Sequence, residues 1–262
     1  MSKKESIPYV ETKIDRGVAV IEFFHPSHNA LPGDILAKLS EQILKAGRMD
    51  EVLVILLKSG GDRTFCAGAS FDELISIEDG VTGKKFFMGF ANVINAIRKC
   101  GKLVIGRVQG KAVGGGVGVL SACDHCFATR YASIRLSELA VGIGPFVIGP
   151  AVSRKTGLSA FSEMALTPND WQSAEYAAQK GLFNAVFNST EEMDEAIDKF
   201  LDEMRGYNPA ALNQLKSIFW KDAENWDVLL EERATISGQL VLSDFSKKTI
   251  AAFKEAARKK KQ

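Results

Sequence analysis

The segment 52–57 is apolar at every position, and this feature restricts the possible folds more than any other in the sequence. An uninterrupted apolar run is typical of a strand that helices cover on both faces of a parallel sheet. The β-branched and aromatic segment 18–24 predicts another strand. Between the two, residues 32–49 carry apolar side chains at helical spacing. A strand, a helix and a strand in this order predict a right-handed crossover unit, and hence an α/β fold.

The rest of the chain continues with strands and then mostly with helices. Strands are expected at 103–108, 126–129 and 185–187. A short helix is expected at 71–77 and a longer one at 86–97, and the polar segment 78–83 between them is expected to be mobile. Further helices are predicted at 151–156, 159–165, 172–180, 190–204, 208–220, 225–240 and 246–259. Several of these later helices have apolar faces that need a packing partner.

Composition and charge are those of an ordinary soluble globular protein. Of the 262 residues, 46% are hydrophobic and 25% are charged, and the net charge of +1 argues against a nucleic-acid partner. No apolar run approaches the ~20 residues of a membrane span, and the first residues lack the apolar core of a signal peptide. A cytoplasmic location without a membrane partner is therefore expected.

The four cysteines are expected to be buried, reduced thiols. Cys123 and Cys126 form a C-x-x-C pair, which is a pattern of redox sites and of half a metal site. The chain has no second such pair and no paired histidines, so no metal site is predicted.

The glycine-rich stretch 110–124 is the first candidate for a functional site. Three consecutive glycines, Gly114 to Gly116, separate the strand at 103–108 from a short apolar helix. Glycine permits a tight turn and a close approach to the backbone, and the first N–H groups of a helix lie at the positive end of its dipole. No Gly-Lys-Ser/Thr follows, which argues against a Walker phosphate loop. The stretch predicts either an oxyanion-stabilising site or only tight packing of a helix on a strand.

Several motifs together resemble the crotonase (enoyl-CoA hydratase/isomerase) superfamily. They are F-C-A-G-A-S-F-D-E-L at 65–74, V-G-G-G-V at 113–117 with C-D at 123–124, S-E-L-A-V-G at 137–142, N-A-L at 29–31 and G-L-F-N-A-V at 181–186. The resemblance covers nearly the whole chain in the same order. It implies a crotonase-like spiral of ββα units over residues 1–200 and a C-terminal helical region at 201–262 used in oligomerisation. The implied assembly is a homotrimer, or a hexamer made of two trimers.

The resemblance also implies roles for individual residues. The N–H groups of Ala69 and Gly115 would hold the oxygen of an acyl-CoA thioester, and Glu138 would act as the catalytic acid and base. The implied substrate and CoA contacts are Ala67, Gly68, Ala69, Phe71, Gly114, Gly115, Phe146 and Phe253. Coenzyme A enters as part of the substrate, so no separate cofactor is expected.

One position departs from the pattern of the family's hydratases. They carry a second glutamate two residues after the glycine triplet, where this chain has Gly118. One carboxylate can carry a proton between two carbons, whereas the addition of water normally needs a second group. The Pro145-Phe146 pair also resembles the family's isomerases. We therefore expect a delta3–delta2 shift of an enoyl-CoA double bond by Glu138 alone.

Other functions remain open at this point. A hydratase would use Asp72 or Glu73 as its second acid, and decarboxylation or carbon–carbon bond formation would use space left at Gly118. A non-catalytic subunit would bind acyl-CoA without turnover. Four aromatic side chains either line an apolar tail pocket or belong to the core: Phe86, Phe87, Phe90 and Phe146.

Overall fold

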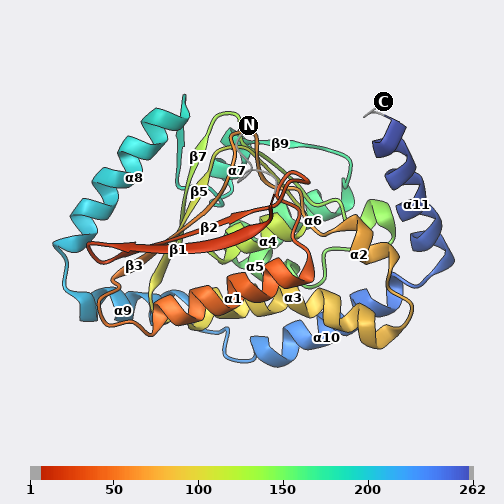
Figure 1. The fold of residues 1–262 in the computed structure, drawn as a ribbon, viewed down its shortest axis with the longest axis horizontal. Helices are drawn as coiled ribbons and strands as arrows, with labels where there is room; N and C mark the ends of the chain where they lie inside the picture. Colours follow the sequence, from red (N-terminus) through yellow and green to blue (C-terminus); the bar gives the residue numbers. More distant parts are fainter. Residues whose placement is uncertain (1–6, 260–262) are drawn as a thin grey trace.

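The computed structural model describes residues 7–259, which form two sheets surrounded by helices (Figure 1). The larger sheet has the strand order β1-β2-β3-β5-β7-β10, and the smaller one has the order β4-β6-β8-β9. The strands of the larger sheet are β1 (Tyr9–Asp15), β2 (Val18–Phe24), β3 (Val54–Ser59), β5 (Leu103–Val108), β7 (His125–Thr129) and β10 (Ala185–Phe187). Those of the smaller sheet are β4 (Thr64–Cys66), β6 (Lys111–Val113), β8 (Ser133–Arg135) and β9 (Gln172–Ser173).

The predicted parallel sheet is present, with one addition. Strands β2, β3, β5, β7 and β10 pair in parallel, and α1 (Gly33–Gly47) connects β2 to β3. The sequence analysis missed β1, which pairs antiparallel with β2 at the edge of the sheet. Four of its seven residues are polar or charged and four are exposed, so no clear apolar alternation indicates a strand.

Helix α3 (Gly80–Lys99) is longer than predicted, and the expectation of a mobile segment over 78–83 is wrong for residues 80–83. Asp79 caps the helix: its Oδ1 accepts from the N–H of Thr82 at 2.7 Å, and its own N–H donates to Thr82 Oγ1 at 3.3 Å. This reciprocal capping box satisfies N–H groups at the helix start that would otherwise lack acceptors. The polar residues at 78–83 thus begin a helix.

Helices α1, α3 and α10 (Trp226–Leu240) lie side by side beneath the larger sheet (Figure 1). At the crossing of α3 and α10 the backbones touch, since a Cβ at Gly83 would lie only 2.6 Å from the carbonyl oxygen of Gly238. The remaining helices are α2 (Phe71–Ile75), α4 (Gly115–Ala122), α5 (Gly149–Thr156), α6 (Leu158–Leu166), α7 (Ala174–Gln179), α8 (Thr190–Arg205), α9 (Pro209–Phe219) and α11 (Asp244–Lys259), with a 3-10 turn, η2 (Leu139–Val141). The expected division at residue 200 falls inside α8.

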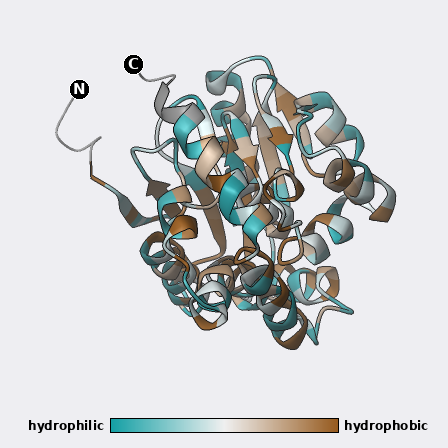
Figure 2. Ribbon diagram, turned by 90° about the vertical axis from the view of Figure 1, so that its right-hand side faces the viewer, coloured by the Kyte–Doolittle hydropathy of each residue, from teal (hydrophilic) through white to brown (hydrophobic). Residues whose placement is uncertain are grey.

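The core lies between the sheets and the helices, and hydrophobic residues concentrate on the strands and on inward helix faces (Figure 2). Trp220, Trp226 and Leu230 from the C-terminal helices belong to the same core cluster as the sheet. All four cysteines are free and buried, as expected. No helix among residues 7–259 has both the length and the apolar character that crossing a membrane requires.

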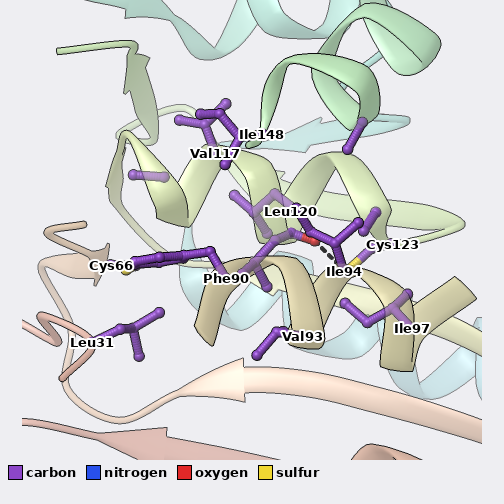
Figure 3. Close-up of a cluster of buried hydrophobic side chains, with 14 of the residues drawn as sticks. Leu31, Cys66, Phe90, Val93, Ile94, Ile97, Val117, Leu120, Cys123 and Ile148 are labelled. Carbon is purple, nitrogen blue, oxygen red and sulfur yellow. Dashed lines mark hydrogen bonds between the residues drawn. The ribbon is translucent and has the colours of Figure 1, made fainter. Parts of the chain in front are cut away.

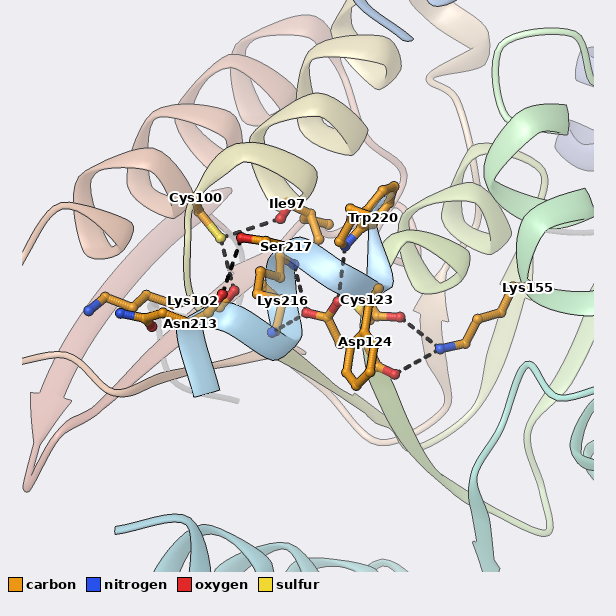
Figure 4. Close-up of polar contacts among 12 residues, drawn as sticks. Ile97, Cys100, Lys102, Cys123, Asp124, Lys155, Asn213, Lys216, Ser217 and Trp220 are labelled. Carbon is orange, nitrogen blue, oxygen red and sulfur yellow. Dashed lines mark hydrogen bonds and ion pairs between the residues drawn. The ribbon is translucent and has the colours of Figure 1, made fainter. Parts of the chain in front are cut away.

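A buried polar cluster joins α9 to the end of α4 (Figure 4). The Asp124 carboxylate accepts from Lys216 Nζ at 2.7 Å, Trp220 Nε1 at 3.0 Å and the N–H of Val104 at 2.7 Å. The Asp124 and Lys216 side chains are only 3% and 2% exposed. Lys155 Nζ donates to the backbone carbonyls of Cys123 and Asp124. These contacts anchor the C-terminal helices to the end of α4 and to β5 of the larger sheet.

Candidate active site

The smaller sheet brings the two glycine-containing loops together. Strands β4 and β6 pair in parallel, so the loop after Cys66 and the loop after Val113 leave the sheet at the same edge. A Cβ at Gly68 would lie 3.0 Å from the carbonyl oxygen of Val113, and one at Gly116 would lie 2.6 Å from Cys66 Cβ. Only glycine permits this close approach, so the packing of the two loops requires glycine at both positions.

Two backbone donors are available at this junction. Gly114 has φ 51° and ψ −118°, a conformation suited to glycine, and it precedes the first turn of α4. Within the described chain, the N–H groups of Gly115 and Ala69 donate to no other group. Ala69 is positioned by Leu31, whose N–H donates to the Gly68 carbonyl at 2.8 Å. Free N–H groups at the start of a helix favour a negative or polarised oxygen.

The carboxyl group of Glu138 lies against the same glycine loop. The N–H of Gly114 donates to the carbonyl of Arg135 at 2.8 Å, which fixes the segment leading from β8 to Glu138. A Cβ at Gly114 would lie 2.8 Å from Glu138 Oε1. The structure therefore brings together Gly114, the neighbouring Gly115 and Glu138, three of the residues that the sequence singled out.

Burial brings the pKa of the Glu138 carboxyl group close to neutral pH. Glu138 as a residue is partly exposed, but its Oε2 is buried and has no hydrogen-bond partner in the described chain. Burial raises the pKa of Glu138 from 4.5 to about 7, while a backbone hydrogen bond and Arg135 act in the opposite direction. Low-dielectric surroundings disfavour the charged form of a carboxyl group. Both protonation states are therefore accessible near neutral pH.

The position of a second carboxylate is filled by an apolar side chain. A Cβ at Gly118 would lie 2.3 Å from Ile148 Cγ2, and Ile148 packs beside Val117 over α4 (Figure 3). The expectation that Gly118 leaves space for a bulky substrate or an anion is therefore wrong, because Ile148 occupies that space.

The two acidic residues considered as a second acid make other contacts. Glu73 Oε2 accepts from the N–H of Gly33 at 2.8 Å, at the start of α1. Asp72 Oδ1 pairs with Lys254 Nζ of α11 at 2.8 Å. Both carboxylates thus serve contacts between elements.

The other predicted contacts lie around the loops and on α11. The N–H of Ala67 donates to the His28 carbonyl at 3.1 Å. Phe71 begins α2 and is 41% exposed, and Phe253 on α11 is 45% exposed. Phe146 packs against Gly144. Their contacts with a substrate remain predictions.

The aromatic residues of α3 belong to the core. Phe86, Phe87 and Phe90 are buried, and a Cβ at Gly115 would lie 2.1 Å from Phe90 Cε1. Figure 3 shows Phe90 beside Cys66 and beneath α4. The phenylalanine therefore supports the glycine loop from beneath.

Arg135 is a site neighbour that the sequence analysis did not identify. It lies three residues before Glu138 and acts on the ionisation of that residue. A charged residue between the apolar Ile134 and Leu136, so close to the candidate base, was a signal that the sequence contained.

The comparisons with known proteins identify the family of the chain. Residues 13–261 match the family model described as enoyl-CoA hydratase/isomerase. The peroxisomal Delta(3,5)-Delta(2,4)-dienoyl-CoA isomerase of Arabidopsis thaliana is 26% identical, over 96% of this chain and 95% of its own length. A short-chain-enoyl-CoA hydratase of Clostridium acetobutylicum is 30% identical, over 68% of this chain and 69% of its own length.

Solved structures confirm the expected fold. An enoyl-CoA hydratase from Bacillus halodurans superimposes with a TM-score of 0.86 at 22% identity, covering 93% of this chain and 99% of that one. A sequence match over nearly the whole chain and a shared fold lead to the same assignment. The chain belongs to the enoyl-CoA hydratase/isomerase family of the crotonase superfamily, and it is an acyl-CoA enzyme of the isomerase, hydratase or lyase type.

Proposed function

We propose that this enzyme shifts the double bond of an enoyl-CoA between the β,γ and α,β positions, with Glu138 as the sole proton carrier. The observation that carries the proposal is that, among residues 7–259, a single carboxyl group lies at the glycine loop. Glu138 lies against Gly114, whereas Ile148 fills the space beside Gly118. One carboxyl group suffices to remove a proton from one carbon and return it to another.

The proposed reaction begins with the thioester oxygen bound by the N–H groups of Ala69 and Gly115. The ionised Glu138 takes a proton from C2 of the 3-enoyl chain, and the electron pair of that C–H bond moves into an extended enolate. Hydrogen-bond donors aimed at the enolate oxygen lower the barrier by roughly 3 kcal/mol each. The protonated Glu138 then returns the proton to C4, which leaves the double bond between C2 and C3.

The pKa of Glu138 suits this cycle. A base that must also act as the acid works best when its pKa is near the working pH. Burial raises the pKa of Glu138 to about 7, which meets that condition. A carboxylate with an ordinary pKa would be a weaker base toward the proton on C2.

The test is the conversion of a 3-enoyl-CoA to the conjugated 2-enoyl-CoA, followed by ultraviolet absorbance. We expect the wild type to form the conjugated product and Glu138→Gln to lose at least a hundredfold in kcat, since proton transfer by a positioned side chain contributes about 10²–10⁴-fold. Glu195→Gln, an exposed change on α8, is the matched control. Full activity of Glu138→Gln contradicts the assignment.

Hydration is the second candidate, favoured by the match to a short-chain-enoyl-CoA hydratase. Adding crotonyl-CoA and following the loss of its conjugated absorbance measures this activity. If Asp72 or Glu73 activates the water, Asp72→Asn or Glu73→Gln abolishes the loss of absorbance while isomerisation continues. Binding of acyl-CoA without either reaction would contradict both candidates.

We also propose the trimeric assembly that the resemblance implies, with coenzyme A as part of the substrate. Helix α9 supports it, because Leu215, Ile218 and Phe219 are 40%, 64% and 44% exposed on one short helix. Their spacing places the three side chains on one face of the helix, and exposed apolar residues gathered in this way are typical of an interface. Light scattering after size-exclusion chromatography measures the mass, and a monomer at micromolar concentration would contradict the proposal.

A further inference from the structure

Two buried polar atoms beside the candidate site lack partners. Among residues 7–259, three buried side-chain polar atoms have no hydrogen bond, and two of them are Arg135 Nε and Glu138 Oε2. Buried polar groups are nearly always paired, so an orphaned group needs an explanation. Here the two unpaired atoms belong to Arg135 and Glu138, which carry opposite charges and lie three positions apart in the sequence.

The glycine loop fixes both residues relative to each other. The Arg135 carbonyl accepts from the N–H of Gly114, and β6 and β8 hold Arg135 in register with Val113. The Cα of Gly114 also faces the Glu138 carboxyl group, whose Oε1 would lie 2.8 Å from a Cβ at that position. The Arg135 and Glu138 side chains, both in the described chain, make no direct ion pair. The charge of Arg135 therefore acts on the Glu138 carboxyl group without direct contact. Gly114 contacts both residues and fixes their relative positions.

An aromatic ring holds the guanidinium group of Arg135. Its Cζ lies 4.6 Å from the centre of the Trp171 ring, and Trp171 directly precedes β9, which pairs with β8. A cation over an indole face is attracted by the ring electrons. Lys111 Nζ lies 4.8 Å from the centre of the same ring. Lys111 thus shares the aromatic partner of Arg135 without acting on Glu138, and it provides a matched control.

The charged residues of the neighbouring elements do not take over the effect of Arg135 on Glu138. Helix α11 packs against η2 and α2, and its described charges include Asp244, Lys247, Lys248 and Lys254. Lys254 pairs with Asp72, and Glu73 binds the start of α1. Among the described charged groups, Arg135 is the one whose charge lowers the pKa of Glu138.

We propose that Arg135 is a positioning residue that keeps the Glu138 carboxyl group in its proton-accepting form, and that Trp171 holds the guanidinium group in place for this purpose. The inference rests on the proposed function of Glu138 as the base. It assigns to β8 and β9 an electrostatic role in the reaction in addition to their role as support for the loop.

The test measures Glu138 protonation directly and without substrate. Infrared spectra as a function of pH, with the Glu138→Gln spectrum subtracted, report the carboxyl C=O band of this residue. We expect Arg135→Gln to move its titration to higher pH, Arg135→Lys to stay near the wild type, and Lys111→Gln to leave it unchanged. Because this readout needs no turnover, it separates failure of the inference from failure of the proposed reaction.

The rate profile is the second readout. For Arg135→Gln, kcat with a 3-enoyl-CoA at pH 7 should fall several-fold and recover as the pH rises, because raising the pH restores the ionised carboxylate. If Arg135→Gln does not fold, Trp171→Ala serves instead and should move the profile in the same direction, whereas Trp171→Phe should not. The proposal is overturned if Glu138 titrates in Arg135→Gln as it does in the wild type. If Arg135→Gln does not fold, the same result in Trp171→Ala overturns it.

Discussion

At the scale of single residues, Glu138 links activity to stability. Its pKa is raised on folding from 4.5 to about 7, so the folded protein binds this proton more tightly than the unfolded chain does. The resulting stabilisation is complete below pH 4.5 and is lost as the pH rises through 7. At pH 8 the native state holds an ionised carboxylate whose buried Oε2 has no hydrogen-bond partner in the described chain, an energetic cost that the proposed reaction requires.

We therefore expect Glu138→Gln to be more stable than the wild type at pH 8, by about 1–3 kcal/mol, with the difference shrinking toward pH 5. Urea unfolding at several pH values measures this difference. The exposed Glu195→Gln should show no such trend. A wild type that is the more stable protein at pH 8 would contradict the burial argument.

Gly118 is the residue that separates this chain from the two-glutamate pattern. We expect Gly118→Ala to lower the free energy of unfolding by about 1–3 kcal/mol, because the new methyl group would lie 2.3 Å from Ile148 Cγ2. Gly80→Ala, with no atom within 4 Å of the new Cβ, is the control that should cost nothing. Adding Ile148→Ala should relieve the Gly118→Ala penalty in a double-mutant cycle, and additivity of the two changes would show that they do not touch.

At the scale of elements, the Asp124 cluster fixes α9 to the end of α4 and to the start of β5. We expect Asp124→Asn to cost about 3–5 kcal/mol of unfolding free energy, since it leaves the ammonium of Lys216 buried without its counter-charge. Asp202→Asn removes an exposed partner of Arg205 and should cost less than about 1 kcal/mol. Equal losses in the two variants would mean that burial of the Asp124–Lys216 pair is unimportant. Denaturant unfolding decides between these outcomes.

The elements also show what the sequence could predict. Strands β2, β3 and β5 were predictable because both faces are covered, which leaves a continuous apolar signature. The edge strand β1 has no such signature because four of its seven side chains are exposed. The start of α3 was misjudged because a capping box consists of polar residues, which also suit a loop.

At the scale of the whole molecule, the site depends on contacts between distant segments. Each glycine loop could be predicted from its own sequence, and the resemblance supplied Glu138. The filling of the space at Gly118 by Ile148, 30 positions later, could not be predicted, because only the fold brings them together. The same holds for Trp171, which meets Arg135 through the pairing of β8 with β9.

Helix α11 covers α2 and η2, two elements beside the candidate site. It packs against α2 and η2, and a Cβ at Gly142 would lie 2.6 Å from Phe245 Cδ1 and Ser246 Oγ. Figure 1 shows it at the opposite end of the molecule from α8. Helix α11 contributes Ile250 to the core, but the α3–α10 packing does not involve this helix, so a chain ending at Ser243 should keep the rest of its fold at lower stability.

We expect that truncated chain to show a higher KM for acyl-CoA and a lower kcat, because α2 and η2 lose the element that holds them. Circular dichroism checks the fold, and the 3-enoyl-CoA assay checks activity. Phe253→Ala in the full chain separates the two contributions: a change in KM alone would assign this side chain to substrate binding. Unchanged kinetics in the truncated chain would mean that α11 acts only outside the active site.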